Sequence, residues 1–244
     1  NMHILFNGCS YTYGDELESP TKHRFSTLVS DYYSSSHTNL AKCGRSNDAI
    51  ARTTMQWFHQ GNTCDVAVIQ WTVISRIEGY NIENNLYENI TVQQPGKWAK
   101  FYGNYYNDQL GANNLWKNCY LLEQYFLKNN IKYVFIFHDR YTNFINETEH
   151  QTTMKGKIVK WKEYDQFTPL LDSPCVWRDM MTSKDYYFLR GNHLHKDEDN
   201  VLITPDSDNQ KAGDNPLLVK SGGHPSILGH QEIKNYIVKY LDSH

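Results

Sequence analysis

Short apolar runs alternate along the chain with stretches in which apolar residues recur at helical spacing. Residues 4–6, 65–72 and 132–138 contain almost continuous apolar runs, and a shorter run covers 38–43. Strands of this kind are typical of a parallel sheet that helices bury on both faces. The pattern predicts an α/β protein with a three-layer α/β/α arrangement.

The stretches between these runs show the periodicity of amphipathic helices. Ser46 or Asn47 can cap the second of them, and Pro225 or Ser226 can open the last. In that last helix the apolar residues recur at Ile227, Ile233, Ile237 and Leu241. Helices are therefore expected at residues 25–33, 47–59, 115–129, 176–189 and from 225 to the C-terminus.

Two long stretches lack such patterns. Residues 78–107 are rich in Asn, Gly and aromatic side chains, which favours an insertion without regular structure that is functional rather than disordered. Residues 190–222 are charged and rich in Asn and Asp, so a polar loop region is expected there. Because no repeat or low-complexity linker separates the stretches, 1–244 is predicted to be a single domain.

Composition excludes several classes of function. A net charge of -3 without a long Lys/Arg run argues against nucleic acid as a partner. The longest apolar runs fall far short of the roughly 20 residues of a membrane helix, and the N-terminal residues do not look like a secretory signal. Five cysteines without close pairs favour a reducing compartment, so a cytoplasmic location is expected, in a host cell or in association with a virion.

Neither a cofactor nor a metal is implied. The glycines from Gly8 to Gly14 match neither a P-loop nor a dinucleotide fingerprint. His193 and His195 lie beside the acidic residues 197–199, but a solvated polar loop is the favoured interpretation, since no third ligand with fixed spacing is apparent.

Polar residues with catalytic potential follow the predicted strands. Ser10 comes just after the first strand, where it is either a nucleophile or a helix cap. Gly44 and Thr72 follow the second and third strands, and His224 precedes the last helix. The carboxyl ends of parallel strands form the ligand-binding edge of an open α/β sheet, so these residues are expected to gather there.

The order and spacing of these residues resemble the SGNH (GDSL-type) hydrolase family. The resemblance is carried by Gly-Cys-Ser-Tyr-Thr-Tyr-Gly at 8–14, by Asn-Leu-Ala at 39–41 leading to Gly-Arg-Ser-Asn at 44–47, and by His-Pro-Ser-Ile-Leu-Gly-His at 224–230. These three motifs resemble those of a branch of the family that is common in bacteriophage genomes. The resemblance implies a flavodoxin-like sheet with Ser10 as nucleophile, His224 as base, and Ser10, Gly44 and Thr72 holding the oxyanion.

Two positions depart from the family pattern. Gln70-Trp71-Thr72-Val73 stands where the family has Gly-x-Asn-Asp, and Ser221 stands where it has an Asp three residues before the histidine. A backbone carbonyl could orient His224 instead, as could Ser221 or an acid from elsewhere: Asp206, Asp208 or Asp214. Asp15 and Glu16 are interpreted as serving a helix dipole. A third alternative is that catalysis has been lost and the site only binds a ligand.

The expected function is hydrolysis of a small acyl ester, such as acetyl on a carbohydrate, by a serine esterase. Two alternatives stay open: an acyltransferase using the same site, and a non-catalytic binding or virion-associated module. The aromatic insertion is either a substrate-binding wall over Ser10 or a structural flap or oligomer contact, and the oligomeric state is open. Candidate substrate contacts are Tyr11, Trp71, Tyr80 and Trp98.

Overall fold

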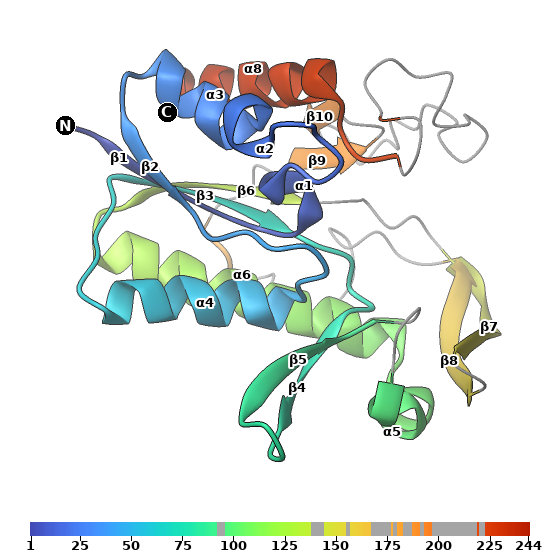
Figure 1. The fold of residues 1–244 in the computed structure, drawn as a ribbon. Coiled ribbons are helices and arrows are strands. Elements are labelled where there is room, and N and C mark those ends of the chain that lie inside the picture. Colours follow the sequence, from blue (N-terminus) through green and yellow to red (C-terminus); the bar gives the residue numbers. More distant parts are fainter. Residues whose placement is uncertain are drawn as a thin grey trace.

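The computed structural model is organised around one mixed sheet (Figure 1). It describes residues 1–91, 96–137, 144–154, 157–166, 177, 180–182, 187–190, 193–196, 219 and 223–244. Within these residues the sheet has six strands in the order β10-β9-β6-β3-β1-β2. The strands are β1 (His3–Asn7), β2 (Ser36–Asn39), β3 (Val66–Trp71), β6 (Lys132–Phe137), β9 (Tyr187–Arg190) and β10 (His193–Lys196).

The sheet has the predicted parallel, flavodoxin-like topology. The pairs β1–β2, β1–β3, β3–β6 and β6–β9 are all parallel, and only β10 runs antiparallel to its neighbour. The chain passes from β1 to β2 on one side and then crosses over to β3 on the other. The order of strands therefore reverses beside β1, and open α/β sheets bind ligands at the carboxyl edge of such a reversal.

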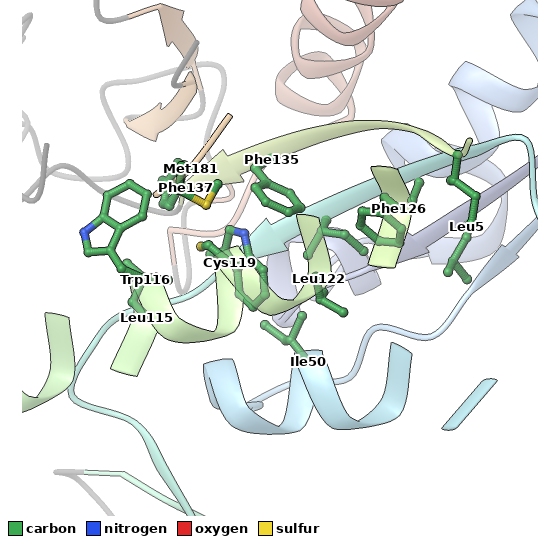
Figure 2. Packing of buried hydrophobic residues seen from close by; sticks show 14 of the residues in the cluster. Leu5, Ile50, Leu115, Trp116, Cys119, Leu122, Phe126, Phe135, Phe137 and Met181 are labelled. Atoms are coloured by element: carbon green, nitrogen blue, oxygen red, sulfur yellow. The ribbon is translucent and has the colours of Figure 1, made fainter. Parts of the chain in front are cut away.

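Alternate strand residues bury opposite faces of the sheet, as the period of two requires. Leu5 and Ile69 pack toward α4 (Asn47–His59) and α6 (Asp108–Lys128), whose side chains complete one core cluster. Figure 2 shows this cluster, with Ile50 from α4 facing Leu122 and Phe126 from α6. The opposite core consists of Ile4, Phe6 and their neighbours against α3 (Phe25–Tyr32) and α8 (Ile227–Ser243).

The helix predictions agree with the structure in most places. Ser46 caps α4 by accepting a hydrogen bond from the Ala49 N–H, and Ser226 caps α8 by accepting one from Gly229. α6 begins seven residues before the predicted position 115. Two four-residue helices, α1 (Ser10–Tyr13) and α2 (Pro20–His23), connect β1 to α3.

The prediction that residues 78–107 lack regular structure is wrong. They contain most of the hairpin β4 (Ile77–Asn81) and β5 (Leu86–Ile90), the 3-10 helix η1 (Gly96–Trp98) and the helix α5 (Ala99–Tyr105). A small core of its own stabilises this insertion: Ile90 and Ala99 pack with Tyr102 and Tyr106, whose ring centres lie 4.8 Å apart in a stacked arrangement. Tyr102, Tyr106 and Trp98, three of the aromatic residues that obscured the periodicity, pack in this core.

The chain between residues 139 and 223 also differs from expectation. β9 occupies the end of the predicted 176–189 helix, and β10 lies inside the predicted 190–222 loop, so His193 and His195 are strand residues. A hairpin of β7 (Phe144–Met154) and β8 (Lys157–Gln166) was not predicted. Apart from Val219, the rest of the predicted polar loop lies outside the described residues.

Candidate active site

Ser10 lies in the turn that ends β1. Cys9 is the N-cap of α1 in an extended conformation, so Ser10 is the first residue of the helix and not its cap. Gly14 ends the helix in the left-handed region, at φ 88°, a conformation that glycine adopts at little cost. The Ser10 side chain therefore emerges at the carboxyl edge of the sheet, where only 6% of its surface is exposed.

Gln70, at the end of β3, holds this turn in place. Its Oε1 atom accepts hydrogen bonds from the Cys9 N–H at 3.1 Å and from the Thr12 hydroxyl at 2.9 Å. A Cβ atom added to Gly8 would lie 2.6 Å from Gln70 Oε1 and 2.5 Å from Thr12 Oγ1. Gly8 is thus required by close approach, and the buried amide of Gln70 holds the backbone before Ser10 and the side chain of Thr12 after it.

His224 joins Ser10 to a carboxylate. Its Nε2 lies 3.0 Å from Ser10 Oγ, and its Nδ1 lies 2.7 Å from Glu16 Oε2. The same Glu16 oxygen accepts the backbone N–H of His224 at 2.9 Å. Because a carboxylate oxygen only accepts, Nδ1 carries the ring proton and Nε2 is left to accept the proton of Ser10. The three residues form a nucleophile, base and orienting acid in hydrogen-bonded series.

The expectation that Glu16 serves a helix dipole is wrong, because its carboxylate binds His224 instead. The preceding helix has only four residues, and Glu16 lies beyond its left-handed end with its own φ at 64°. This conformation turns the side chain back toward His224 instead of leaving it on the helix. The alternatives Ser221 and Asp214 lie outside the described residues, as do Asp206 and Asp208.

Of the three predicted oxyanion residues, Ser10 lies in the turn itself, and Gly44 and Thr72 follow the neighbouring strands β2 and β3. The loop carrying Gly44 is held to that turn by a hydrogen bond of 3.4 Å from the Lys42 N–H to the Gly8 carbonyl, and Gly44 is left-handed with φ 76°. Asn47 clamps the backbone of Thr72, donating to its carbonyl at 3.1 Å and accepting from its N–H at 2.8 Å. The Thr72 hydroxyl accepts from Arg76 at 2.9 Å and retains its own proton to donate.

The structure places the four predicted substrate contacts in different environments. Tyr11 packs against the base, its ring centre 5.5 Å from that of His224. The expectation for Trp71 is wrong, because its ring is fully buried against Phe135 in the core and no substrate reaches it. Tyr80 is exposed on the β4–β5 hairpin and pairs with Tyr87.

Trp98 lines an open groove that begins at the predicted oxyanion glycine. The groove has a volume of about 660 Å³, and its other lining residues are Cys43, Gly44, Glu88, Asn89, Thr91, Gly96 and Lys97. Trp98 is fixed by a hydrogen bond of 2.8 Å to Glu88 and by contact with Gly79, where an added Cβ would lie 2.8 Å from the indole. The insertion thus forms one wall of a cleft beside the site.

The charges around the site come from a few side chains. Among the residues that the structure describes, no cluster of three or more His, Cys, Asp or Glu side chains is arranged to hold a metal ion. Burial raises the pKa of the Cys43 thiol to about 11, with Asp15 as a nearby negative charge that acts in the same direction. Cys43 therefore stays a neutral thiol at physiological pH.

In the part of the chain that the structure describes, no helix is both long and apolar enough to cross a membrane.

His230 is a buried packing residue. Its Nδ1 accepts the Phe25 N–H at 3.0 Å, and its ring stacks on Phe25. Burial, with smaller contributions from Arg24 and His224, lowers the pKa of His230 to about 3. The folded protein thus holds this imidazole neutral at pH values where the unfolded chain, with a pKa near 6.5, protonates it.

This difference predicts acid destabilisation. The stability from neutral His230 is complete above pH about 6.5 and is lost as the pH falls toward 3. Between pH 7 and pH 5 the free energy of unfolding is expected to fall by about 2 kcal/mol more in the wild type than in His230→Asn, which keeps an acceptor for Phe25. Urea titrations at both pH values measure the difference. Equal losses in the two proteins would contradict the assignment.

Comparisons with known proteins gave a structural similarity but no family match. No protein-family model matches the chain, and neither does any curated protein. Among solved structures, the chain is similar to a proposed lipolytic protein of the GDSL family from Desulfitobacterium hafniense DCB-2, with a TM-score of 0.48 and 11% identity. The similarity covers 98% of this chain and 99% of that chain. It concerns the path of the chain and not the side chains of the site.

Proposed function

We propose that the protein is a serine esterase in which Ser10 attacks the carbonyl carbon of an ester. The observation that carries this proposal is the unbroken series of hydrogen bonds from Ser10 Oγ through His224 to Glu16. Serine is a weak nucleophile until a base accepts its proton, and a neutral imidazole with its free nitrogen toward Oγ does so near neutral pH. The Glu16 carboxylate then stabilises the imidazolium that forms.

The tetrahedral intermediate places a negative charge on the former carbonyl oxygen. We propose that the N–H groups of Ser10 and Gly44, with the Thr72 hydroxyl, donate to that oxygen. Fixed donors of this kind typically contribute about 100- to 1000-fold each to the rate. Support comes from the fixed backbone at two of these donors: Gln70 holds the turn at Ser10, and Asn47 clamps the backbone of Thr72 through two hydrogen bonds. The intermediate collapses as His224 returns the proton to the leaving alcohol.

We propose a small acyl group, such as acetyl, and a carbohydrate alcohol as the substrate. The 6% exposure of Ser10 favours a short acyl chain, because a long one needs an apolar channel at the nucleophile. The groove at Gly44 combines an indole with amide, carboxylate and ammonium groups from Asn89, Glu88 and Lys97. Aromatic faces beside polar groups suit a sugar, whose faces are apolar and whose edges carry hydroxyl groups.

Hydrolysis of p-nitrophenyl esters from acetate to octanoate tests the proposal, together with acetylated and deacetylated oligosaccharides of the same length. We expect kcat/KM to fall as the acyl chain grows, and acetate release from the oligosaccharide. Transfer of the acyl group to an added alcohol, with little release to water, would instead indicate an acyltransferase. No turnover of any ester by the wild type would contradict the esterase.

A separate prediction concerns Trp98, which lines the groove. Replacing it with alanine removes a stacking face, so KM for an acetylated oligosaccharide should rise about tenfold, as expected for the loss of an aromatic contact of about 1.4 kcal/mol. The effect on p-nitrophenyl acetate should be smaller. Tyr80→Ala is the matched control, since Tyr80 lies on the hairpin but does not line the groove. Equal effects of the two changes would argue against the groove as the sugar site.

A further inference from the structure

A second carboxylate lies on the nucleophile side of His224. Asp15 Oδ2 is 3.7 Å from His224 Nε2, the nitrogen that faces Ser10 Oγ. This separation is too long for a direct hydrogen bond. Glu16 already occupies the other ring nitrogen, so Asp15 is not needed to orient the imidazole. The function of Asp15 must be sought on the reacting side of the ring.

Asp15 is held in this position by two hydrogen bonds within its own turn. Its Oδ1 accepts the Glu16 N–H at 3.1 Å, and its backbone N–H donates to the Ser10 carbonyl at 3.0 Å. The Cys43 thiol, from the loop that carries Gly44, has the Asp15 carboxylate as a nearby negative charge. Oδ1 is engaged by the Glu16 N–H, and Oδ2 lies 3.7 Å from His224 Nε2.

The space between Oδ2 and Nε2 suits one water molecule. A water at ordinary hydrogen-bond lengths of roughly 2.8 Å from both atoms fits between two acceptors 3.7 Å apart. Solvent has access, because 40% of the Asp15 side chain and 24% of the His224 side chain are exposed. Once Ser10 carries an acyl group, its hydroxyl proton is gone and Nε2 is free to accept a proton from water.

We propose that Asp15 positions the water that releases the acyl group from Ser10, an inference that rests on the proposed esterase. One water proton is donated to Asp15 Oδ2 as a hydrogen bond, and the other faces Nε2. The water oxygen forms a bond to the acyl carbon, and its second proton moves to Nε2. The electron pair on the oxyanion then re-forms the carbonyl, the bond from carbon to Ser10 Oγ breaks, and His224 returns the proton to Oγ. The products are a carboxylic acid and free Ser10.

This assignment predicts different effects on the two halves of the reaction. In the first half the nucleophile is Ser10, which His224 holds without help from Asp15, so Asp15→Asn should change acylation by less than about threefold. In the second half the variant loses the fixed acceptor for water, and deacylation should slow about 10- to 100-fold, as expected for a hydrogen bond to a charged group. The acyl-enzyme should therefore accumulate.

The experiment follows p-nitrophenyl acetate in two ways. Stopped-flow absorbance gives the rate of p-nitrophenol release in the first turnover, and intact-protein mass spectrometry of acid-quenched samples gives the fraction of enzyme carrying one acetyl group at steady state. Asp15→Ser provides a second variant that keeps an oxygen acceptor for the Glu16 N–H. Glu18→Gln is the matched control, because it removes an exposed carboxylate from the same loop.

The expected result is a higher acetylated fraction and slower turnover in both Asp15 variants than in the wild type and Glu18→Gln. An acetylated fraction equal to that of the wild type, or equal slowing of both halves, would overturn the role of Asp15. Absence of both p-nitrophenol release and acetylated Ser10 in every protein, the wild type included, would contradict the esterase itself.

Discussion

Ser10→Ala and His224→Ala are each expected to lower kcat for p-nitrophenyl acetate by about 10⁴- to 10⁶-fold. The first removes the nucleophile, and the second removes the only ring nitrogen within hydrogen-bond distance of Ser10 Oγ among the described residues, at 3.0 Å. Residues of this kind act as a unit, so the loss of either one costs about as much as the loss of both. Initial rates for the single variants and the double variant measure this directly.

Matched controls distinguish chemistry from folding. Ser10→Ala removes one oxygen from a largely buried side chain whose neighbours are fixed by Gln70. Its thermal midpoint should therefore stay close to that of the wild type. His59→Ala, at the exposed end of α4, tests the general effect of removing a histidine. Additive losses in the double variant, or residual activity above a hundredth of the wild type in either single variant, would contradict the paired roles.

Glu16→Ala is expected to lower kcat by about 10³- to 10⁴-fold while the thermal midpoint changes little. One oxygen of Glu16 accepts both the ring Nδ1–H and the backbone N–H of His224. Removing it frees the imidazole to rotate and to adopt the other tautomer, which typically costs a serine enzyme about this factor. The kcat and KM values should be separated, because the loss should fall on kcat.

Glu16→Gln separates the charge from the geometry. The backbone N–H of His224 is always a donor, so it selects the amide oxygen of Gln over the amide nitrogen, and the ring keeps its tautomer. Only the charge is lost, and kcat should fall about 10- to 100-fold, as expected for a charge-assisted hydrogen bond. A glutamine variant as impaired as the alanine variant would contradict this division, and normal activity in both would remove Glu16 from the site.

The sheet and the places of Ser10 and His224 were predictable because their signals are local. Residues 4–6 and 66–69 are apolar on both faces of their strands, as a strand must be when helices cover both sides. Strand ends then bring Ser10 and Thr72 to the same edge without further information. Helical spacing between Ile233 and Leu241 in the same way predicts the buried face of α8.

Glu16 was not predictable from local pattern. Its role depends on a left-handed backbone beyond Gly14 and on a histidine more than 200 residues later in the chain. Residues in that conformation are usually Gly or Asn, so a glutamate gives no sign of it. The signal that existed was an acidic pair immediately after a glycine that ends a one-turn helix at the ligand-binding edge.

The prediction that Trp71 contacts the substrate was wrong for a related reason. Trp71 is the last residue of β3, and Trp98 lies in the insertion. Side-chain type alone does not distinguish a buried indole from one that lines a groove. Trp71 continues the strand alternation into the core, where it meets Phe135. Trp98 packs one edge against Gly79 and remains partly exposed. Tertiary packing decides between the two.

The central claim is that His224 and Glu16 activate Ser10 as a nucleophile. The most direct measurement is labelling of the purified protein with a fluorophosphonate, followed by peptide mapping of the modified residue. We predict stoichiometric modification at Ser10 in the wild type, much slower modification in His224→Ala and Glu16→Ala, and none in Ser10→Ala. An unmodified wild-type protein, or a label on another residue, would contradict the claim.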